Sequence, residues 1–280
     1  MPNECQNMTR KVPLFGRFMN KIEINRAHLI DQLTMLYNQE IKAVGNDEYL
    51  LSHSNLNSIR RQLDVFEKYI CYIKRDTSVL DWGCNHAPDS CMIRAVLGES
   101  IRLYACDFAD PCTYRHFHEF ARIEYSKLTD PIKLPYDNHA FDTVVASGVL
   151  EHTIMDYESL KELHRVLKEC GHLIITFLPN RMSYTEFALR LCAQPHHIRL
   201  YSLREADRMM RHCGFKPCYA NYHQFVPSQR FGALFNNFWF INRIFEKLWP
   251  TRLFCSSIII VSQRCSALSR TKRTTGSTRG

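Results

Sequence analysis

Short apolar runs alternate with helical stretches from residue 78 onward, and this alternation constrains the fold more than any other feature of the sequence. The apolar runs are SVLDW, IRLYACD, ARIEYS, FDTVVAS and GHLIITFL, and the helices between them are predicted to begin near Pro88, Pro111 and Tyr157. Two further strands are predicted in KPCYANYHQFV and LFCSSIIIVSQ. Strands that alternate with helices build a parallel sheet with helices on both faces. The sequence therefore predicts an α/β fold with a doubly wound, mostly parallel, seven-stranded sheet.

The N-terminal part of the sequence follows a different pattern. Residues 21–42 carry apolar side chains at three- and four-residue spacing, which predicts a helix. A polar break at residues 43–58 precedes a second predicted helix at residues 59–75, which runs directly into the first strand. We expect residues 1–75 to form a helical extension that acts as a lid and is not a separate domain, because the segment has too few apolar residues for its own core.

Composition limits the class of protein. With 280 residues, 45% of them hydrophobic, the chain can bury a sizeable core. Its 12 cysteines include no C-x-x-C pair, which argues against a zinc ribbon or a redox dithiol. No apolar run approaches the roughly 18 residues that span a bilayer, so we expect a cytoplasmic protein. Residues 265–280 are small, polar and basic, contribute much of the net charge of +8, and are predicted to form a disordered tail.

The segment SVLDWGCNHAPDS, residues 78–90, contains the end of the first predicted strand. In doubly wound sheets, ligands bind beyond the carboxyl ends of the strands. Gly83 allows the backbone to turn close to a ligand, and Pro88 suits the first turn of a helix whose N–H groups face that ligand. About two dozen residues later the second predicted strand ends in Asp107, a residue type that binds a ribose diol at this position. A nucleotide-like cofactor is therefore expected at this edge of the sheet.

Four segments carry a resemblance to a known family. VLDWGCNHAPDS, YACDF, DPIKLPYDNHAFDTVVASGVLEH and LKELHRVLKECGHLIITFLPN resemble, in order, the motifs of class I S-adenosylmethionine-dependent methyltransferases. The resemblance covers residues 75–180 and continues more weakly to about residue 222. It implies a Rossmann-like methyltransferase domain at residues 76–264 with S-adenosyl-L-methionine as its cofactor.

The resemblance also implies roles for single residues. Asp81 would orient the methionine part of the cofactor, and the backbone from Gly83 to Asn85 would pass beneath it. Asp107 would bind the two ribose hydroxyls. The residues alone leave one alternative open, which is that Asp81 and Asp107 cap helices.

The adenine and the sulfonium have their own implied contacts. Phe108 would lie against the adenine, and Asp130 would accept a hydrogen bond from its amino group. Ser147 and Gly148, at the end of the fourth predicted strand, would approach the methionine part and the sulfonium. The alternatives are that Asp130 starts a turn and that Gly148 relieves crowding.

The first loop departs from the pattern of the family, which has Gly-x-Gly-x-Gly where this chain has Gly83, Asn85 and Ala87. Asparagine is one of the few residues other than glycine that tolerate positive φ, and we expect Asn85 to adopt a left-handed conformation. An inactive, methyltransferase-like binding or scaffold protein is the alternative function that this departure leaves open.

Histidines mark the predicted acceptor side. His152, which follows the fourth strand, is the candidate catalytic base if the acceptor is a hydroxyl or phenol; orienting the loop is its alternative role. His196, His197 and Arg199 are the candidate substrate residues, with an exposed helix start as the alternative. No metal site is predicted, because His196 and His197 are adjacent and no pair of acids converges with them in a recognisable spacing.

Residues 230–249, RFGALFNNFWFINRIFEKLW, are predicted to form an amphipathic helix within an aromatic insertion at residues 230–250. Their apolar surface exceeds what one face can bury. We therefore predict an apolar or lipid-like acceptor and peripheral membrane contact through this segment. A homodimer interface and packing in the core are the alternatives.

The predicted function is methyl transfer from S-adenosylmethionine to a small-molecule acceptor. A nucleic-acid substrate is not expected, because SGVL follows the fourth strand where amino-group methylators of nucleic acids carry Asn-Pro-Pro-Tyr or a relative. A dehydrogenase is a less favoured alternative, because that class of enzyme does not explain the segment LPYDNHAFD and the Leu-Glu-His that follows it at residues 150–152.

Overall fold

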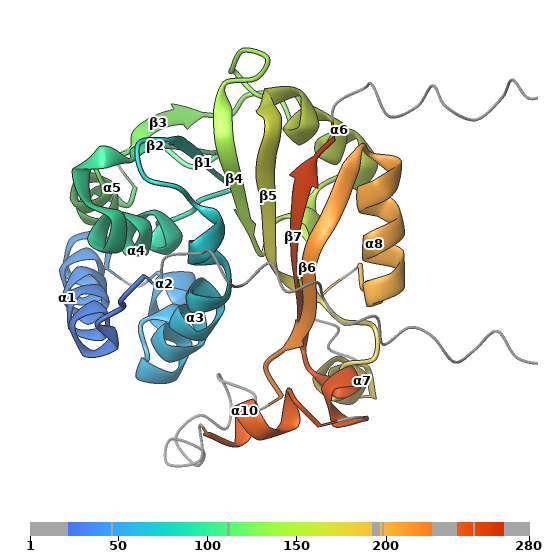
Figure 1. The fold of residues 1–280 in the computed structure, drawn as a ribbon. Coiled ribbons are helices and arrows are strands. Elements are labelled where there is room, and N and C mark those ends of the chain that lie inside the picture. The colour runs from blue at the N-terminus through green and yellow to red at the C-terminus, as the bar shows by residue number, and fades with distance from the viewer. Residues whose placement is uncertain are drawn as a thin grey trace, which may run out of the picture.

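The computed structural model describes residues 22–45, 47–110, 113–191, 197, 199–225, 240–248 and 250–265. Seven strands form one sheet in the order β3-β2-β1-β4-β5-β7-β6, and β7 runs antiparallel to β5 and β6 while the other pairings are parallel (Figure 1). This order confirms the predicted Rossmann-like, doubly wound sheet. The strands are β1 Ser78–Trp82, β2 Arg102–Asp107, β3 Glu124–Lys127, β4 Phe141–Ser147, β5 Leu167–Pro179, β6 Phe215–His223 and β7 Ser257–Arg264.

Each face of the sheet has its own hydrophobic core, because successive residues of a strand point to opposite faces. Val79 and Val145 pack in one core with residues of α1 (Arg26–Val44), α3 (Leu56–Tyr69), α4 (Pro88–Leu97) and α5 (Arg115–Ala121). Leu80 and Val144, their neighbours in the chain, pack in the other core with residues of α6 (Asp156–Val166) and α8 (Leu203–His212). Figure 1 shows the first group of helices on the opposite side of the sheet from α8.

The N-terminal helices belong to the first core. Leu29, Leu33 and Leu36 of α1 are buried there against the other helices of that face. A short helix, α2 (Glu48–His53), lies between α1 and α3 where the sequence predicts only a polar break. Its N-cap is Asp47, whose carboxylate accepts a hydrogen bond from the Leu50 N–H at 3.0 Å. The predicted polar break therefore contains a short capped helix, which the sequence pattern did not indicate.

Two further helices lie at the carboxyl ends of the parallel strands, α7 (Tyr184–Leu191) and α10 (Phe240–Phe245) (Figure 1). The sequence pattern missed α7, and the helix expected near Pro111 begins at Arg115. Phe245 stacks on Phe225 with 4.4 Å between ring centroids, so this part of the predicted aromatic helix packs on the domain.

Several predictions concern residues outside the described ranges. These are the aromatic segment up to residue 239, including Trp239, and the tail at residues 266–280. Within the ranges that are described, no helix has the length and apolar character needed to cross a membrane.

Candidate functional site

The carboxyl ends of β1, β2 and β4 lie side by side. In the parallel register, Trp82 of β1 is opposite Cys106 of β2 and Ala146 of β4. The next residues along these three strands therefore meet at one edge of the sheet, and they include Gly83, Asp107 and Ser147. The strand order alone brings Gly83 together with Ser147, which lies 64 positions later, and with Asp107 between them.

The loop after β1 holds three alternate residues at positive φ. The φ angles are 66° at Gly83, 48° at Asn85 and 58° at Ala87. The left-handed conformation predicted for Asn85 is confirmed, and Ala87 shares it. At Gly83 a side chain is also excluded by space, because an added Cβ would lie 2.6 Å from a methyl carbon of Val149. The chain thus has the backbone of a glycine-rich turn with only one glycine.

Asp107 is tied to this loop. Its Oδ2 accepts a hydrogen bond from the Asn85 N–H at 2.7 Å, and its Oδ1 accepts one from the Phe108 N–H at 2.6 Å. An ionised carboxylate offers about four lone-pair positions, so two remain for a ligand. The Phe108 side chain is 53% exposed, which is unusual for a phenylalanine beside a polar strand end.

A buried pair of acids lies beneath the loop. Asp81 Oδ2 accepts a hydrogen bond from the Ser90 hydroxyl at 2.7 Å, and Asp89 accepts hydrogen bonds from the hydroxyls of Tyr69 and Ser147. Burial raises the pKa of Asp81 to about 7, and the nearby Asp89 adds to the rise. Burial also raises the pKa of Asp89. The hydroxyls of Tyr69 and Ser147 thus hold Asp89 in place, and the predicted contact of Asp81 with a cofactor stays a prediction.

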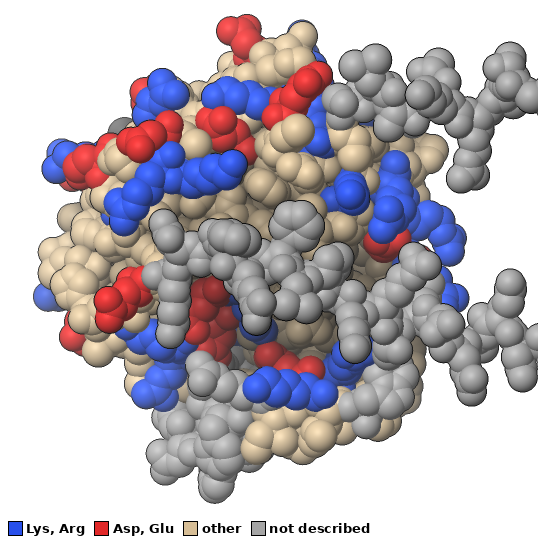
Figure 2. Space-filling view, viewed as in Figure 1, with Lys and Arg blue, Asp and Glu red and all other residues tan. Residues whose placement is uncertain are grey.

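The N-terminal helices bring a phenol and a guanidinium to the same edge. Burial raises the pKa of Tyr49 on α2, Arg61 acts in the opposite direction, and the charges of Asp107, Asp89 and Glu151 raise it further. Tyr49 is therefore influenced by carboxylates from three parts of the fold, which are β2, α4 and the segment after β4. Figure 2 shows acidic and basic side chains gathered around a hollow in the lower half of this face, between the positions of α3 and α10 in Figure 1.

Arg61 on α3 has no ion pair with a carboxylate among the residues that the structure describes. Its Nη1 donates to Gln224 Oε1 at 3.3 Å, its buried Nε has no partner, and its guanidinium lies 4.9 Å from the ring centroid of Phe177. Burial lowers the pKa of Arg61. Phe177 has a φ of 56° within an irregularity of β5 between Ile175 and Leu178, and such bulges redirect side chains near binding sites.

The predicted acceptor side is a cluster of histidines and acids. One ligand atom each of Glu151, His152 and His197 lies within 4.8 Å of the others. His197 Nδ1 lies 2.7 Å from Oε1 of Glu186 on α7. Burial raises the pKa of Glu151 to about 7. Both acids reach His197 through the fold and not through a short sequence spacing, so the spacing gave no sign of this cluster.

The other predicted residues are placed differently. Arg199 donates a hydrogen bond to the backbone oxygen of Ile154, two residues beyond His152, and His196 lies outside the described residues. Asp130 is exposed, and its Oδ1 accepts hydrogen bonds from the N–H groups of Ile132 and Lys133, which lower its pKa. The turn foreseen at Asp130 is therefore present, while its contact with an adenine stays a prediction.

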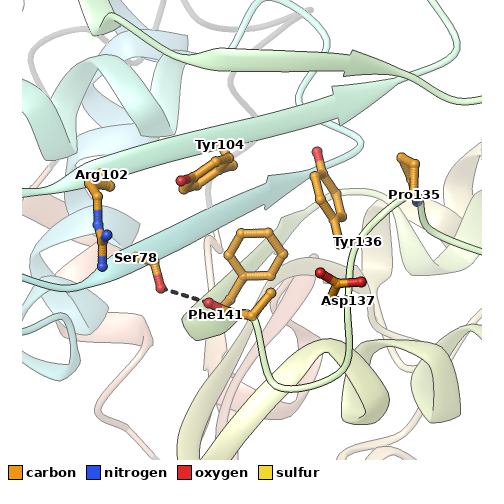
Figure 3. A pocket seen from close by; sticks show the side chains of 8 residues that line it. Ser78, Arg102, Tyr104, Pro135, Tyr136, Asp137 and Phe141 are labelled. Atoms are coloured by element: carbon orange, nitrogen blue, oxygen red, sulfur yellow. Dashed lines mark hydrogen bonds between the residues drawn. The ribbon is translucent and has the colours of Figure 1, made fainter.

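A small cavity of about 270 Å³ lies at the opposite edge of the sheet. Ser78, Arg102 and Phe141, which begin β1, β2 and β4, line it together with Tyr104 and Tyr136 (Figure 3). The rings of Tyr104 and Tyr136 pack edge-on against Phe141 at centroid distances of 5.3 and 4.9 Å. The amino ends of the strands are not where this type of sheet binds ligands, so the cavity is separate from the candidate site.

Comparison with known proteins identifies the domain. The family model described as "Methyltransferase domain" matches residues 53–219, which is more than half of the chain. No significant match is found among curated protein sequences.

Two solved structures show the similarity of fold. The 1,6-didemethyltoxoflavin-N1-methyltransferase of Burkholderia thailandensis, solved with S-adenosylhomocysteine, is 14% identical with a TM-score of 0.53, and the match covers 84% of this chain and 90% of that one. The MccD protein is 17% identical with a TM-score of 0.52, and the match covers 72% and 96%. At this identity the structures establish the fold alone. The family model, which spans the loop after β1, the candidate site and most of β6, shows that the chain belongs to the methyltransferase domain family.

Proposed function

We propose that this methyltransferase binds S-adenosylmethionine at the carboxyl ends of β1, β2 and β4 and acts on a small-molecule acceptor with an apolar part. The cofactor supplies a methyl group on a sulfonium, whose displacement requires positioning and exclusion of water more than a dedicated catalytic group. The residues at this edge of the sheet match the charges of such a ligand, which carries a carboxylate, two cationic centres and a ribose diol.

Arg61 is the observation that carries the proposal. A guanidinium that is partly removed from water usually contacts an anion, because only a partner offsets the cost of the lost hydration. Arg61 lacks a carboxylate partner in the described part of the chain, and its buried Nε has no hydrogen bond. The methionine carboxylate of the cofactor would supply both. This assigns Arg61, and not its neighbour Arg60, as the residue that holds the carboxylate.

Asp107 and Phe108 support the rest of the cofactor. The two lone-pair positions that remain on the Asp107 carboxylate suit a ribose diol, and the exposed ring of Phe108 beside it offers a flat apolar surface for the adenine. Tyr49 on α2, which lies among the surrounding carboxylates, gives the N-terminal helices a lid role over the same site.

An apolar acceptor is supported by exposed side chains near the histidines. Ile154, Phe187 and Leu191 are 69%, 66% and 74% exposed. Ile154 follows His152 by two residues, and the other two lie on α7, whose Glu186 contacts His197. Exposed apolar groups beside a polar site commonly mark a binding surface. A lipid-like acceptor is the form of the proposal that would use all three side chains.

The test is calorimetric titration of S-adenosylhomocysteine into the wild type and two matched variants. Arg61→Gln should weaken binding by roughly 10- to 150-fold, which corresponds to the 1.5–3 kcal/mol of a charge-assisted hydrogen bond. Arg60→Gln, one residue away, should bind as the wild type does. Equal affinities in a folded Arg61→Gln variant would remove Arg61 from the site. A screen for transfer of labelled methyl to extracted lipids and polar metabolites would then identify the acceptor class.

A further inference from the structure

We propose that Glu151, His152 and His197 form a binding site for a divalent transition-metal ion. The function of this site rests on the proposed methyl transfer, but its existence does not. Two imidazoles and one carboxylate from different elements converge here, with one potential ligand atom of each within 4.8 Å of the others. Glu151 and His152 lie in the 3-10 helix η4 (Leu150–His152) after β4, and His197 follows α7.

Glu151 supplies a second observation that points to a cation. The residue is only 6% exposed, and its Oε2 is buried without a hydrogen-bond partner. A buried carboxylate oxygen with no donor is costly, and a metal ion is one of the few groups that compensates it. The other oxygen, Oε1, lies 3.9 Å from His152 Nε2. The carboxylate therefore lies beside the imidazoles and keeps one buried oxygen without a hydrogen-bond partner among the described residues.

His197 is arranged as metal-binding histidines commonly are. Its Nδ1 lies 2.7 Å from the Oε1 of Glu186, which is buried on α7. In metal sites a ligating histidine usually gives its other ring N–H to a carboxylate, which fixes the tautomer and turns the opposite nitrogen to the metal. Glu186 would therefore act as a positioning residue, and Nε2 of His197 would be the ligand atom.

The donor set narrows the choice of metal. Imidazoles suit zinc, copper, iron and nickel, whereas magnesium, calcium and manganese favour oxygen ligands. Three protein ligands leave positions open for water or for a substrate atom, as in catalytic sites and unlike closed structural sites.

The place of the site in the fold suggests what would occupy the open position. A Cβ added at Gly148, at the end of β4, would lie 3.8 Å from Glu151 Oε1. The cluster therefore adjoins the strand end where the cofactor is proposed to bind. A metal ion there would hold an oxygen of the acceptor and favour loss of its proton to solvent, because coordination lowers the pKa of a bound hydroxyl. The acceptor class that fits is a hydroxyl or phenol, and exposed Ile154 and Phe187 would contact its apolar part.

The experiment is a titration of the full-length, untagged protein with Co²⁺ in the absence of any cofactor, followed by visible absorption and calorimetry. We expect one ion per chain in the wild type. His197→Gln should abolish this binding over the same concentration range, and Glu186→Gln should weaken it by roughly 10- to 100-fold, as loss of a carboxylate behind a ligating histidine does. His28→Ala, which changes an exposed histidine on α1, is the matched control and should bind as the wild type does.

Two results would overturn the metal site. One is the absence of stoichiometric Co²⁺ binding by the wild type, and the other is equal binding by the wild type and a folded His197→Gln variant, with folding checked by circular dichroism. A parallel titration of S-adenosylhomocysteine in the presence of EDTA separates this proposal from the proposed function. Cofactor binding without Co²⁺ binding would leave the methyltransferase site standing and remove the metal.

Discussion

At the scale of single residues, the loop after β1 shows how a glycine-rich turn is built with one glycine. Gly83 cannot be replaced, because both its φ of 66° and the contact with Val149 exclude a side chain. Asn85 and Ala87 adopt the same left-handed region with side chains that tolerate it better than β-branched ones do. The altered motif therefore preserves the backbone, and its letters alone do not imply an inactive protein.

Substitutions at Asn85 test this reading of the loop. Asn85→Gly should keep the free energy of unfolding within a few tenths of a kcal/mol of the wild type or raise it, because glycine adopts positive φ without strain. Asn85→Val should lower it by about 1–3 kcal/mol, the cost of holding a β-branched residue in that region. Urea unfolding measures both, and S-adenosylhomocysteine affinity should follow the same order. Identical values for the two variants would show that backbone conformation at residue 85 has no energetic consequence.

Residue roles were predictable from sequence only where they depend on neighbours in the chain. Asp107 could be placed because it ends a strand, and Asn85 because asparagine tolerates positive φ. Sequence gives no reason to prefer Arg61 over the adjacent Arg60, and the contacts of the Arg61 guanidinium with Gln224 and Phe177 are visible only in the structure. The convergence of Glu186 and Glu151 on His197 could not be predicted from sequence, because Glu186 lies on α7, Glu151 lies after β4 and His197 lies beyond α7.

At the scale of elements, the N-terminal helices are part of the domain and not an attachment to it. Leu33 and Tyr37 of α1 are buried with residues of α3, α4 and α5, and the Tyr37 hydroxyl lies 2.8 Å from His86 Nε2 in the loop after β1. The same helices carry Arg61 and Tyr49 to the candidate site. These helices cannot move away from the sheet without loss of packing in the shared core.

Two substitutions on α1 test this integration. Leu33→Ala should lower the free energy of unfolding by about 2–5 kcal/mol, as loss of a buried leucine does. Met35→Ala, two residues away on the exposed face, should change it by less than about 0.5 kcal/mol. Both variants should unfold in one transition by urea titration. A separate early transition in Leu33→Ala, with the sheet still folded, would mean that the helices form an independent unit.

The elements that sequence reasoning missed are short. Strands β1, β4 and β7 were found because each is an apolar run buried along most of its length. The helix α8 was found because it is amphipathic and followed by Gly214. In contrast, α2 has six residues and only Leu50 buried, so it has almost no periodicity. Its one local signal was Asp47, a residue type that favours the N-cap. The Asp47 carboxylate accepts a hydrogen bond from the N–H of Leu50, three positions later.

At the scale of the whole molecule, the strand order turns separate motifs into one site. The Arg61 guanidinium meets Gln224, which lies 163 residues later in the chain, while Asp107 and Ser147 reach the same edge from two different strands. The presence of a doubly wound sheet was predictable from the alternation of strands and helices. The lid role of the N-terminal helices stays a prediction, and the side chains that these helices contribute near the carboxyl edge, Tyr49 and Arg61, were visible only in the structure.

The central claim is that S-adenosylmethionine binds at this edge through Asp107, and the direct test is calorimetry with S-adenosylhomocysteine on three proteins. The wild type should bind one molecule per chain. Asp107→Ala should lose roughly 1.5–3 kcal/mol, or about 10- to 150-fold in affinity, because a charge-assisted contact to the ribose is removed. Asp207→Ala, which changes an acid on α8 that pairs only with Arg211 among its described ion pairs, should bind as the wild type does. Wild-type affinity in a folded Asp107→Ala variant, or no binding by the wild type, would contradict the account.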